Sequence, residues 1–171
     1  MQRKAFVLIG CSVLIFVTGA TAFAQSAAFL SIPGIPGESQ TVPGAIDLQS
    51  YTFSARAREG LQPPLFGDFN LTATVSKASP LLMLGVGTSH LYGSAVLSVR
   101  RTDGLQVEFV KYTLTNVRIT SYQPQPADTL PSEQFTVAYG RIQFDYWIVN
   151  PDGSQGENTR TCWDISRGQE C

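Results

Sequence analysis

Residues 135–148, FTVAYGRIQFDYWI, decide the fold class of this chain. Large apolar side chains recur there at every second position, at Phe135, Val137 and Tyr139 and then at Ile142, Phe144, Tyr146 and Ile148. A period of two is typical of a β-strand that turns one face toward a core. The phase shifts at Gly140, which predicts a bulge or sharp bend between two strands.

Further strands are predicted on the same grounds at residues 29–32, 46–55, 69–76, 94–101 and 107–122. The last stretch is too long and too variable in phase for one flat strand, so we expect a bend or break near Thr115-Asn116. Asp103-Gly104 lies between two strands and is typical of a two-residue hairpin turn, because both residues tolerate a positive φ.

One segment departs from the strand pattern. Ser79-Pro80 is followed by the apolar run 81–84. A serine hydroxyl can cap the free N–H groups of a helix, and proline suits the first helical position. We therefore expect a short helix from about Pro80 to Ser89. The fold class predicted is mainly β, a small β-barrel or two-sheet sandwich with one short α-helix.

The N-terminus has the pattern of a signal peptide. Arg3 and Lys4 precede the apolar stretch 5–17, and Ala22-Phe23-Ala24 fits a small-x-small cleavage site, so we expect cleavage after Ala24. An uncleaved membrane anchor is the alternative, because residues 5–24 carry no charge. A lipoprotein signal ending at Cys11 is a further alternative, although its apolar region would hold only residues 5–10. Cleavage predicts an exported bacterial protein, periplasmic or extracellular.

Composition limits the classes of partner. The chain has 171 residues, with 12 Lys+Arg and 13 Asp+Glu, which fits one domain. Without residues 1–24, which contain Arg3 and Lys4, 10 Lys+Arg remain against 13 Asp+Glu, a net charge of −3. That balance argues against nucleic-acid binding, which relies on clustered cations. We also expect no membrane association once the signal peptide is removed.

Two cysteines remain in the mature chain, Cys162 and Cys171. An even pair in an exported protein predicts a disulfide. We divide the chain into residues 1–24 as the signal peptide, 25–149 as the β-barrel domain and 150–171 as a C-terminal extension. Asn150-Pro151-Asp152-Gly153 predicts a turn, and the rest of the extension is polar.

The sequence offers few residues for chemistry. One His and three Cys nearly exclude a metal site of the usual His/Cys kind, which needs three or four such ligands. His90 has no recognisable acid or oxyanion partner, so a polar residue in a helix-end turn is the preferred interpretation. Asp68, Glu108 and Asp145 are candidates for paired carboxylates, yet each lies singly on a predicted strand. We therefore assign no catalytic, cofactor-binding or metal-binding residue.

Two further features are ambiguous. Residues 34–37 (GIPG) loosely suggest a phosphate loop, but they lack its glycine spacing and its lysine. Trp147 and Trp163 are candidate ligand platforms or packing residues, and Trp163 is next to the predicted disulfide.

Four blocks of this sequence resemble the haemolysin-coregulated protein (Hcp) family, the tube subunits of type VI secretion. They are residues 29–39 (FLSIPGIPGES), 46–53 (IDLQSYTF), 77–82 (KASPLL) and 131–146 (PSEQFTVAYGRIQFDY). The family-motif residues within these blocks are Gly37, Glu38, Ser39, Ser79, Pro80 and Glu133.

The resemblance implies a two-sheet β-barrel with one flanking helix, and a homohexameric ring with a wide channel. It also implies that rings stack into a tube, that secretion-machinery or effector proteins are further partners, and that no catalysis or cofactor is involved. A ring needs heterologous contacts between subunits. A monomeric secreted β-barrel that binds a ligand or protein partner is the alternative, and a carboxylate hydrolase is a more remote one.

Overall fold

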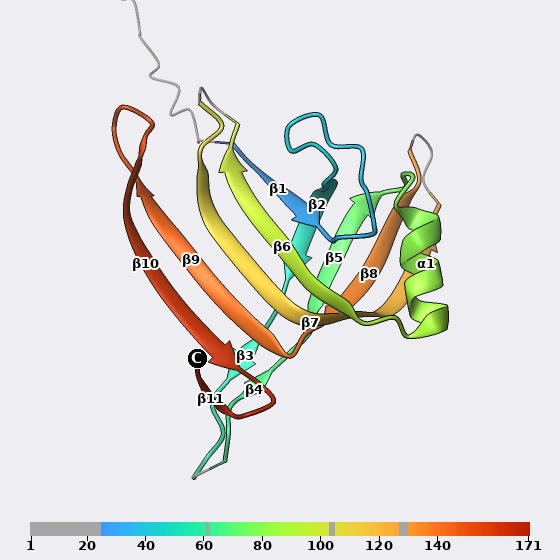
Figure 1. Ribbon diagram of the computed structural model, residues 1–171. Coiled ribbons are helices and arrows are strands. Elements are labelled where there is room, and N and C mark those ends of the chain that lie inside the picture. The colour runs from blue at the N-terminus through green and yellow to red at the C-terminus, as the bar shows by residue number, and fades with distance from the viewer. Residues whose placement is uncertain (1–24, 61, 103–104, 127–129) are drawn as a thin grey trace, which may run out of the picture.

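The computed structural model describes residues 25–60, 62–102, 105–126 and 130–171 (Figure 1). The predicted signal peptide and the Asp103-Gly104 turn lie outside the described residues. The elements are β1 (Ser26–Ser31), β2 (Ile46–Thr52), β3 (Ala55–Arg56), β4 (Leu65–Phe66), β5 (Phe69–Thr74), α1 (Ser79–Thr88), β6 (Tyr92–Arg101), β7 (Glu108–Gln125), β8 (Ser132–Ala138), β9 (Arg141–Val149), β10 (Gln155–Asp164) and β11 (Gln169–Glu170). In this part of the chain, no helix has the length and apolar character needed to cross a membrane.

Six of these strands close into a barrel. The order is β7-β6-β1-β2-β5-β8, and β8 also pairs with β7, so the sheet returns to its starting strand. All of these pairings are antiparallel. Strands β9, β10 and β11 extend the sheet from the first half of β7. The prediction of a mainly β barrel with one short helix is confirmed.

Strand β7 belongs to both parts of the sheet because it bends. Its residues from Val110 to Thr115 pair with β9, whereas those from Arg118 to Gln125 pair with β8. Asn116 lies between the two regions with a φ of 56°. Asparagine tolerates this left-handed conformation better than most residues. The bend expected near Thr115-Asn116 is therefore present.

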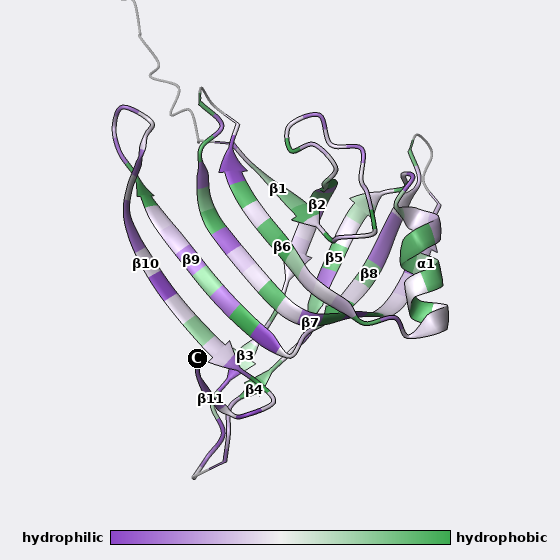
Figure 2. Ribbon diagram, viewed as in Figure 1, coloured by the Kyte–Doolittle hydropathy of each residue, from purple (hydrophilic) through white to green (hydrophobic). Residues whose placement is uncertain are grey.

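The barrel core follows the period-two pattern of the sequence. Leu71 of β5 pairs with Phe135 of β8, and Phe69 pairs with Val137, and all four side chains are buried. Figure 2 shows the resulting alternation of apolar and polar residues along β6, β7 and β9. Each buried side chain of this size contributes about 1.5–3 kcal/mol to folding.

Helix α1 forms close to its predicted bounds, but its start differs in detail. Ala78 is the N-cap residue, and no side chain caps the helix. The Ser79 hydroxyl instead accepts a hydrogen bond from the Ser76 N–H at 2.9 Å, which closes the turn before the helix. The expectation that Ser79 caps the helix is wrong, because the helix begins one residue earlier. Ser89 ends the helix with a φ of 50°.

Gly140 lies between β8, which belongs to the barrel, and β9, which begins the extension of the sheet. Its N–H donates to the Thr115 carbonyl at 2.9 Å, next to the bend of β7. A Cβ at Gly140 would lie 3.2 Å from the Asn116 Cβ. The close approach explains why a small residue occurs at the phase shift.

The C-terminal extension continues the sheet. Residues 150–153 form the expected turn, in which the Gly153 N–H donates to the Asn150 carbonyl at 2.9 Å. Strand β10, which the sequence did not predict, then pairs with β9. Cys162 and Cys171 form a disulfide with their Cα atoms 5.3 Å apart.

Candidate functional site

The family-motif residues Gly37, Glu38 and Ser39 lie in the loop between β1 and β2. The Gly37 N–H donates to the Gly44 carbonyl at 2.9 Å, and the Ser39 N–H donates to the Ala45 carbonyl at 3.0 Å. A Cβ at Gly37 would lie 2.0 Å from the Ala45 oxygen, so only glycine fits there. These two bonds fold the loop back onto the start of β2.

Ser39 organises the tip of the same loop. Its hydroxyl accepts hydrogen bonds from the N–H groups of Thr41 at 3.3 Å and Val42 at 3.1 Å. The nearby Ile35 N–H donates to the Ile32 carbonyl. Several N–H groups of this glycine-rich loop are thus used within the fold rather than presented to an anion. The loop is therefore a structural element.

Two other family-motif residues, Ser79 and Glu133, meet through Tyr122. The Tyr122 hydroxyl donates to Glu133 Oε2 at 2.9 Å, and the Ser79 hydroxyl also bonds Tyr122. Burial and the bond to Glu133 raise the pKa of Tyr122. Glu133 is fully buried, and among the described residues its Oε1 has no hydrogen-bond partner. The cluster joins the start of α1 to β7 and β8. Sequence reasoning missed Tyr122, which lies outside the four resembling blocks.

The three candidate carboxylates have separate partners. Glu108 lies 3.7 Å from the Arg100 guanidinium. Asp68 lies at the limit of hydrogen bonding, 3.5 Å from the Thr120 hydroxyl. Each of these two carboxylates therefore has its own contact on a different strand, with β6 for Glu108 and with β7 for Asp68. Among the described residues, no group of three or more His, Cys, Asp or Glu side chains could hold a metal.

Asp145 is the most enclosed of these carboxylates, with 1% of its surface exposed. Burial alone would raise its pKa, but hydrogen bonds from Gln143 and Arg160 outweigh this effect and hold the pKa below its usual value. The Gln143 amide donates at 2.7 Å, and the Arg160 side chain is the ion-pair partner from β10. Lys111 of the neighbouring strand β7 is the direct pairing partner of Asp145. Asp145 thus links β9 to both neighbouring strands as a stable anion.

His90 follows the end of α1. Its N–H donates to the Gly85 carbonyl at 3.2 Å, and its ring packs edge-on against Tyr92 at 4.5 Å between centroids. This position agrees with a residue of a helix-end turn.

Exposed apolar side chains gather on two different sides of the molecule. Helix α1 contains no charged residue, and while Leu82 packs inward, Met83 and Leu84 are 60% and 57% exposed. On β9, Tyr146 and Ile148 are 43% and 50% exposed. Figure 1 shows α1 and β9 on opposite sides of the barrel. The protein thus presents two different apolar surfaces, which we call the helix patch and the β9 patch.

A third surface is polar but uncharged. It is a shallow depression of about 710 Å³ over β2, β5, β7 and β8. Hydroxyl and amide side chains line most of it: Ser50, Thr52, Asn70, Thr72, Ser121, Gln123, Gln134 and Thr136. The Ser121 hydroxyl donates to Thr136, which donates in turn to Asn70.

Comparison with known proteins identifies relatives of the chain. Residues 29–146, which are 118 of the 171, match the family model described as "Type VI secretion system effector, Hcp". No curated protein matches the sequence.

Solved structures share the fold at low sequence identity. Hcp1 from Salmonella typhimurium is 19% identical, with a TM-score of 0.74, and the match covers 87% of this chain and 100% of that one. "Structure of a type six secretion system protein" describes another, 17% identical with a TM-score of 0.79, covering 86% of this chain and 100% of that one. A type VI secretion system effector from Yersinia pestis is 21% identical with a TM-score of 0.67, covering 81% and 99%. The shared fold thus extends beyond residues 29–146.

Proposed function

This chain belongs to the Hcp family of type VI secretion, and from that premise we propose that it is a non-enzymatic subunit that assembles into homohexameric rings. Family members are secreted tube proteins, and they form ring assemblies. The rings of this protein would stack into a tube. Its further partners would be components of the secretion machinery or effector proteins.

The two apolar surfaces are the observation that carries this proposal. A cyclic ring uses heterologous contacts, in which one surface of a subunit meets a different surface of the next. The helix patch and the β9 patch are different surfaces on opposite sides of the barrel. A helix that is apolar all round normally has partners on more than one side. Met83 and Leu84 remain more than half exposed in the single subunit, so a neighbouring subunit is the further partner that the ring would supply.

Size-exclusion chromatography with light scattering tests the proposal. The purified chain is expected to elute with six times the subunit mass. Replacing Met83 or Leu84 with Glu places a charge in the apolar contact that is expected between neighbouring subunits. Burying this charge without a partner is unfavourable, so the hexamer should dissociate. Gln123→Glu, an exposed position outside both patches, is the matched control and should leave the hexamer intact. A monomer at high concentration would contradict the ring.

We also propose export through residues 1–24, followed by cleavage after Ala24. The apolar stretch and the small-x-small site support this expectation. The cleaved protein would be periplasmic or extracellular, without membrane or nucleic-acid partners, and would comprise the barrel domain 25–149 with the extension 150–171. N-terminal sequencing of the exported protein should begin at Gln25. A retained N-terminus would favour the membrane anchor, and a lipid on Cys11 would favour the lipoprotein.

The uncharged depression favours a second candidate function, a monomeric secreted binding module. Its hydroxyl and amide side chains would suit a neutral polar ligand or protein segment. The same light-scattering experiment separates the two functions, because this candidate requires a stable monomer.

A further inference from the structure

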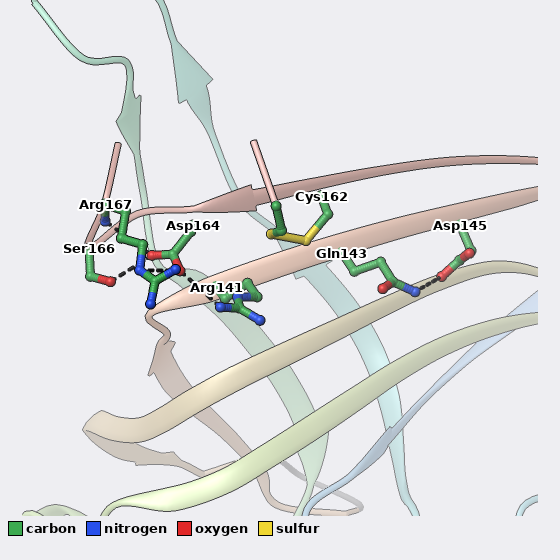
Figure 3. Close-up of a disulfide and its surroundings, with 8 residues drawn as sticks. Arg141, Gln143, Asp145, Cys162, Asp164, Ser166 and Arg167 are labelled. Atoms are coloured by element: carbon green, nitrogen blue, oxygen red, sulfur yellow. Dashed lines mark hydrogen bonds and ion pairs between the residues drawn. A yellow bond between two sulfur atoms is a disulfide. The ribbon is translucent and has the colours of Figure 1, made fainter. Parts of the chain in front are cut away.

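The C-terminal residues fold back along β10 and are held there by few contacts other than the disulfide. Strand β11 has two residues, which pair with Trp163 and Asp164, and both are exposed. The Cys171 N–H donates to the Cys162 carbonyl at 3.3 Å. We call residues 162–171 the bracket; Figure 3 shows its disulfide and the side chains around Asp164.

Asp164 fixes the turn of the bracket. Its carboxylate accepts hydrogen bonds from the Ser166 hydroxyl at 2.6 Å and the Arg167 N–H at 3.1 Å, and an ion pair from Arg141 at 3.0 Å. These interactions hold the first half of the bracket against β9. They do not reach β11, whose position depends on two pairs of strand residues and on the covalent bond.

The bracket contacts a narrow hairpin, which we call the arm, residues 53–60 and 62–67. Its strands β3 and β4 have two residues each and pair only with one another. The Phe66 ring stacks on Trp163 with centroids 5.9 Å apart. Gly168 faces Pro63 across a space that one added carbon would fill, since a Cβ at Gly168 would be 3.7 Å from the Pro63 Cβ. Figure 1 shows the arm projecting from the barrel beside β11 and the C-terminus.

The base of the arm is fixed to the barrel, but its outer part is not. The Gly67 N–H donates to the Ser54 carbonyl at 2.8 Å, and the Tyr139 hydroxyl donates to the Gly67 carbonyl at 3.0 Å. Beyond these bonds the described residues of the arm are mostly exposed. A two-stranded hairpin is marginally stable by itself. The order of its outer part therefore depends on the bracket.

We infer that the Cys162–Cys171 disulfide is a redox-dependent lock on the arm. A dithiol reductant would supply two electrons and two protons; the S–S bond would break to give two thiols, and the reductant would become a disulfide. Release of the short loop would let β11 separate from β10. Trp163 would then lose its pairing with Glu170, and the arm would lose the support behind its stacking contact between Phe66 and Trp163. This inference does not depend on ring formation.

Hydrogen–deuterium exchange measured by mass spectrometry tests the lock. The purified chain is compared before and after treatment with dithiothreitol under native conditions. Reduction is expected to accelerate exchange in the arm by at least about tenfold, the scale of a lost loop constraint. Exchange in β5 is the internal control and should not change. The Cys162→Ser/Cys171→Ser variant should exchange like the reduced protein, with or without dithiothreitol.

Two results would overturn the inference. If reduction frees residues 169–171 while the arm exchanges as before, the disulfide does not control the arm. If exchange accelerates equally in the arm and in β5, the disulfide stabilises the whole fold rather than the arm alone. Reoxidation should restore slow exchange in the arm, and failure to do so would contradict reversibility.

Discussion

Replacing Gly37 with Ala adds only one carbon atom, yet it should be among the most destabilising substitutions in this protein. The added Cβ would lie 2.0 Å from the Ala45 oxygen and 2.5 Å from the Ile46 nitrogen, all within rigid backbone. Relief of this overlap requires the loop to move away from β2 by about 1 Å or more, toward ordinary contact distances. That movement breaks the Gly37–Gly44 and Ser39–Ala45 hydrogen bonds, at about 1 kcal/mol each, and disturbs the buried start of β2. We expect a loss of at least about 3 kcal/mol.

Urea denaturation followed by circular dichroism measures this loss. Gly34→Ala is the matched control, in the same loop, where the added Cβ meets open space but φ is 93°. Only the strain of a positive φ applies there, at about 1–2 kcal/mol. An equal or smaller destabilisation by Gly37→Ala than by Gly34→Ala would contradict this prediction.

Three further changes have predicted outcomes. Gly87→Ala, in open space within α1, should raise stability by about 0.5–1 kcal/mol, and a lower urea midpoint would contradict this. Tyr122→Phe deprives buried Glu133 of its hydrogen bond and should cost about 1–3 kcal/mol; an unchanged midpoint would show that the bond contributes nothing. The lowered pKa of Asp145 means that its contribution is present above the unfolded value of 3.8 and is lost as the pH falls through the folded pKa. The stability advantage of the wild type over Asp145→Asn should therefore shrink as the pH falls below the unfolded value of 3.8. A difference that stays constant with pH would argue against an ionised Asp145.

The barrel strands were predictable because each buries one face. Phe69, Leu71, Phe135 and Val137 alternate with polar residues, so the period of two identifies both the strands and the core. The bend of β7 was also predictable, since the apolar phase changes near Asn116. Strands of this kind, and the positions where they bend, can be predicted because the spacing of apolar residues in the sequence reflects which face of each strand is buried.

Strand β10 could not be predicted in this way. Five of its consecutive residues, 157–161, are exposed polar residues, so no apolar alternation marks it. Backbone pairing with β9 and the ion pair between Arg160 and Asp145 hold it in place. The cluster of Ser79, Tyr122 and Glu133 could not be predicted for a different reason. Tyr122 and Glu133 lie on the neighbouring strands β7 and β8, but Ser79 comes from the distant start of α1, and only the folded chain brings it to Tyr122.

The pairing of β1 with β6 also has a consequence for the order in which the chain folds. Ser26 pairs with Arg101 and Ser31 with Val96, so 65 to 75 residues separate the partners. At a synthesis rate of about 5–20 residues per second, β1 emerges roughly 3–15 s before β6. Phe29 and Leu30, both buried in the barrel, have no complete partner during that interval. Among the described strands, β1 is made first yet is among the later ones to be enclosed, and non-local closure of this kind slows folding.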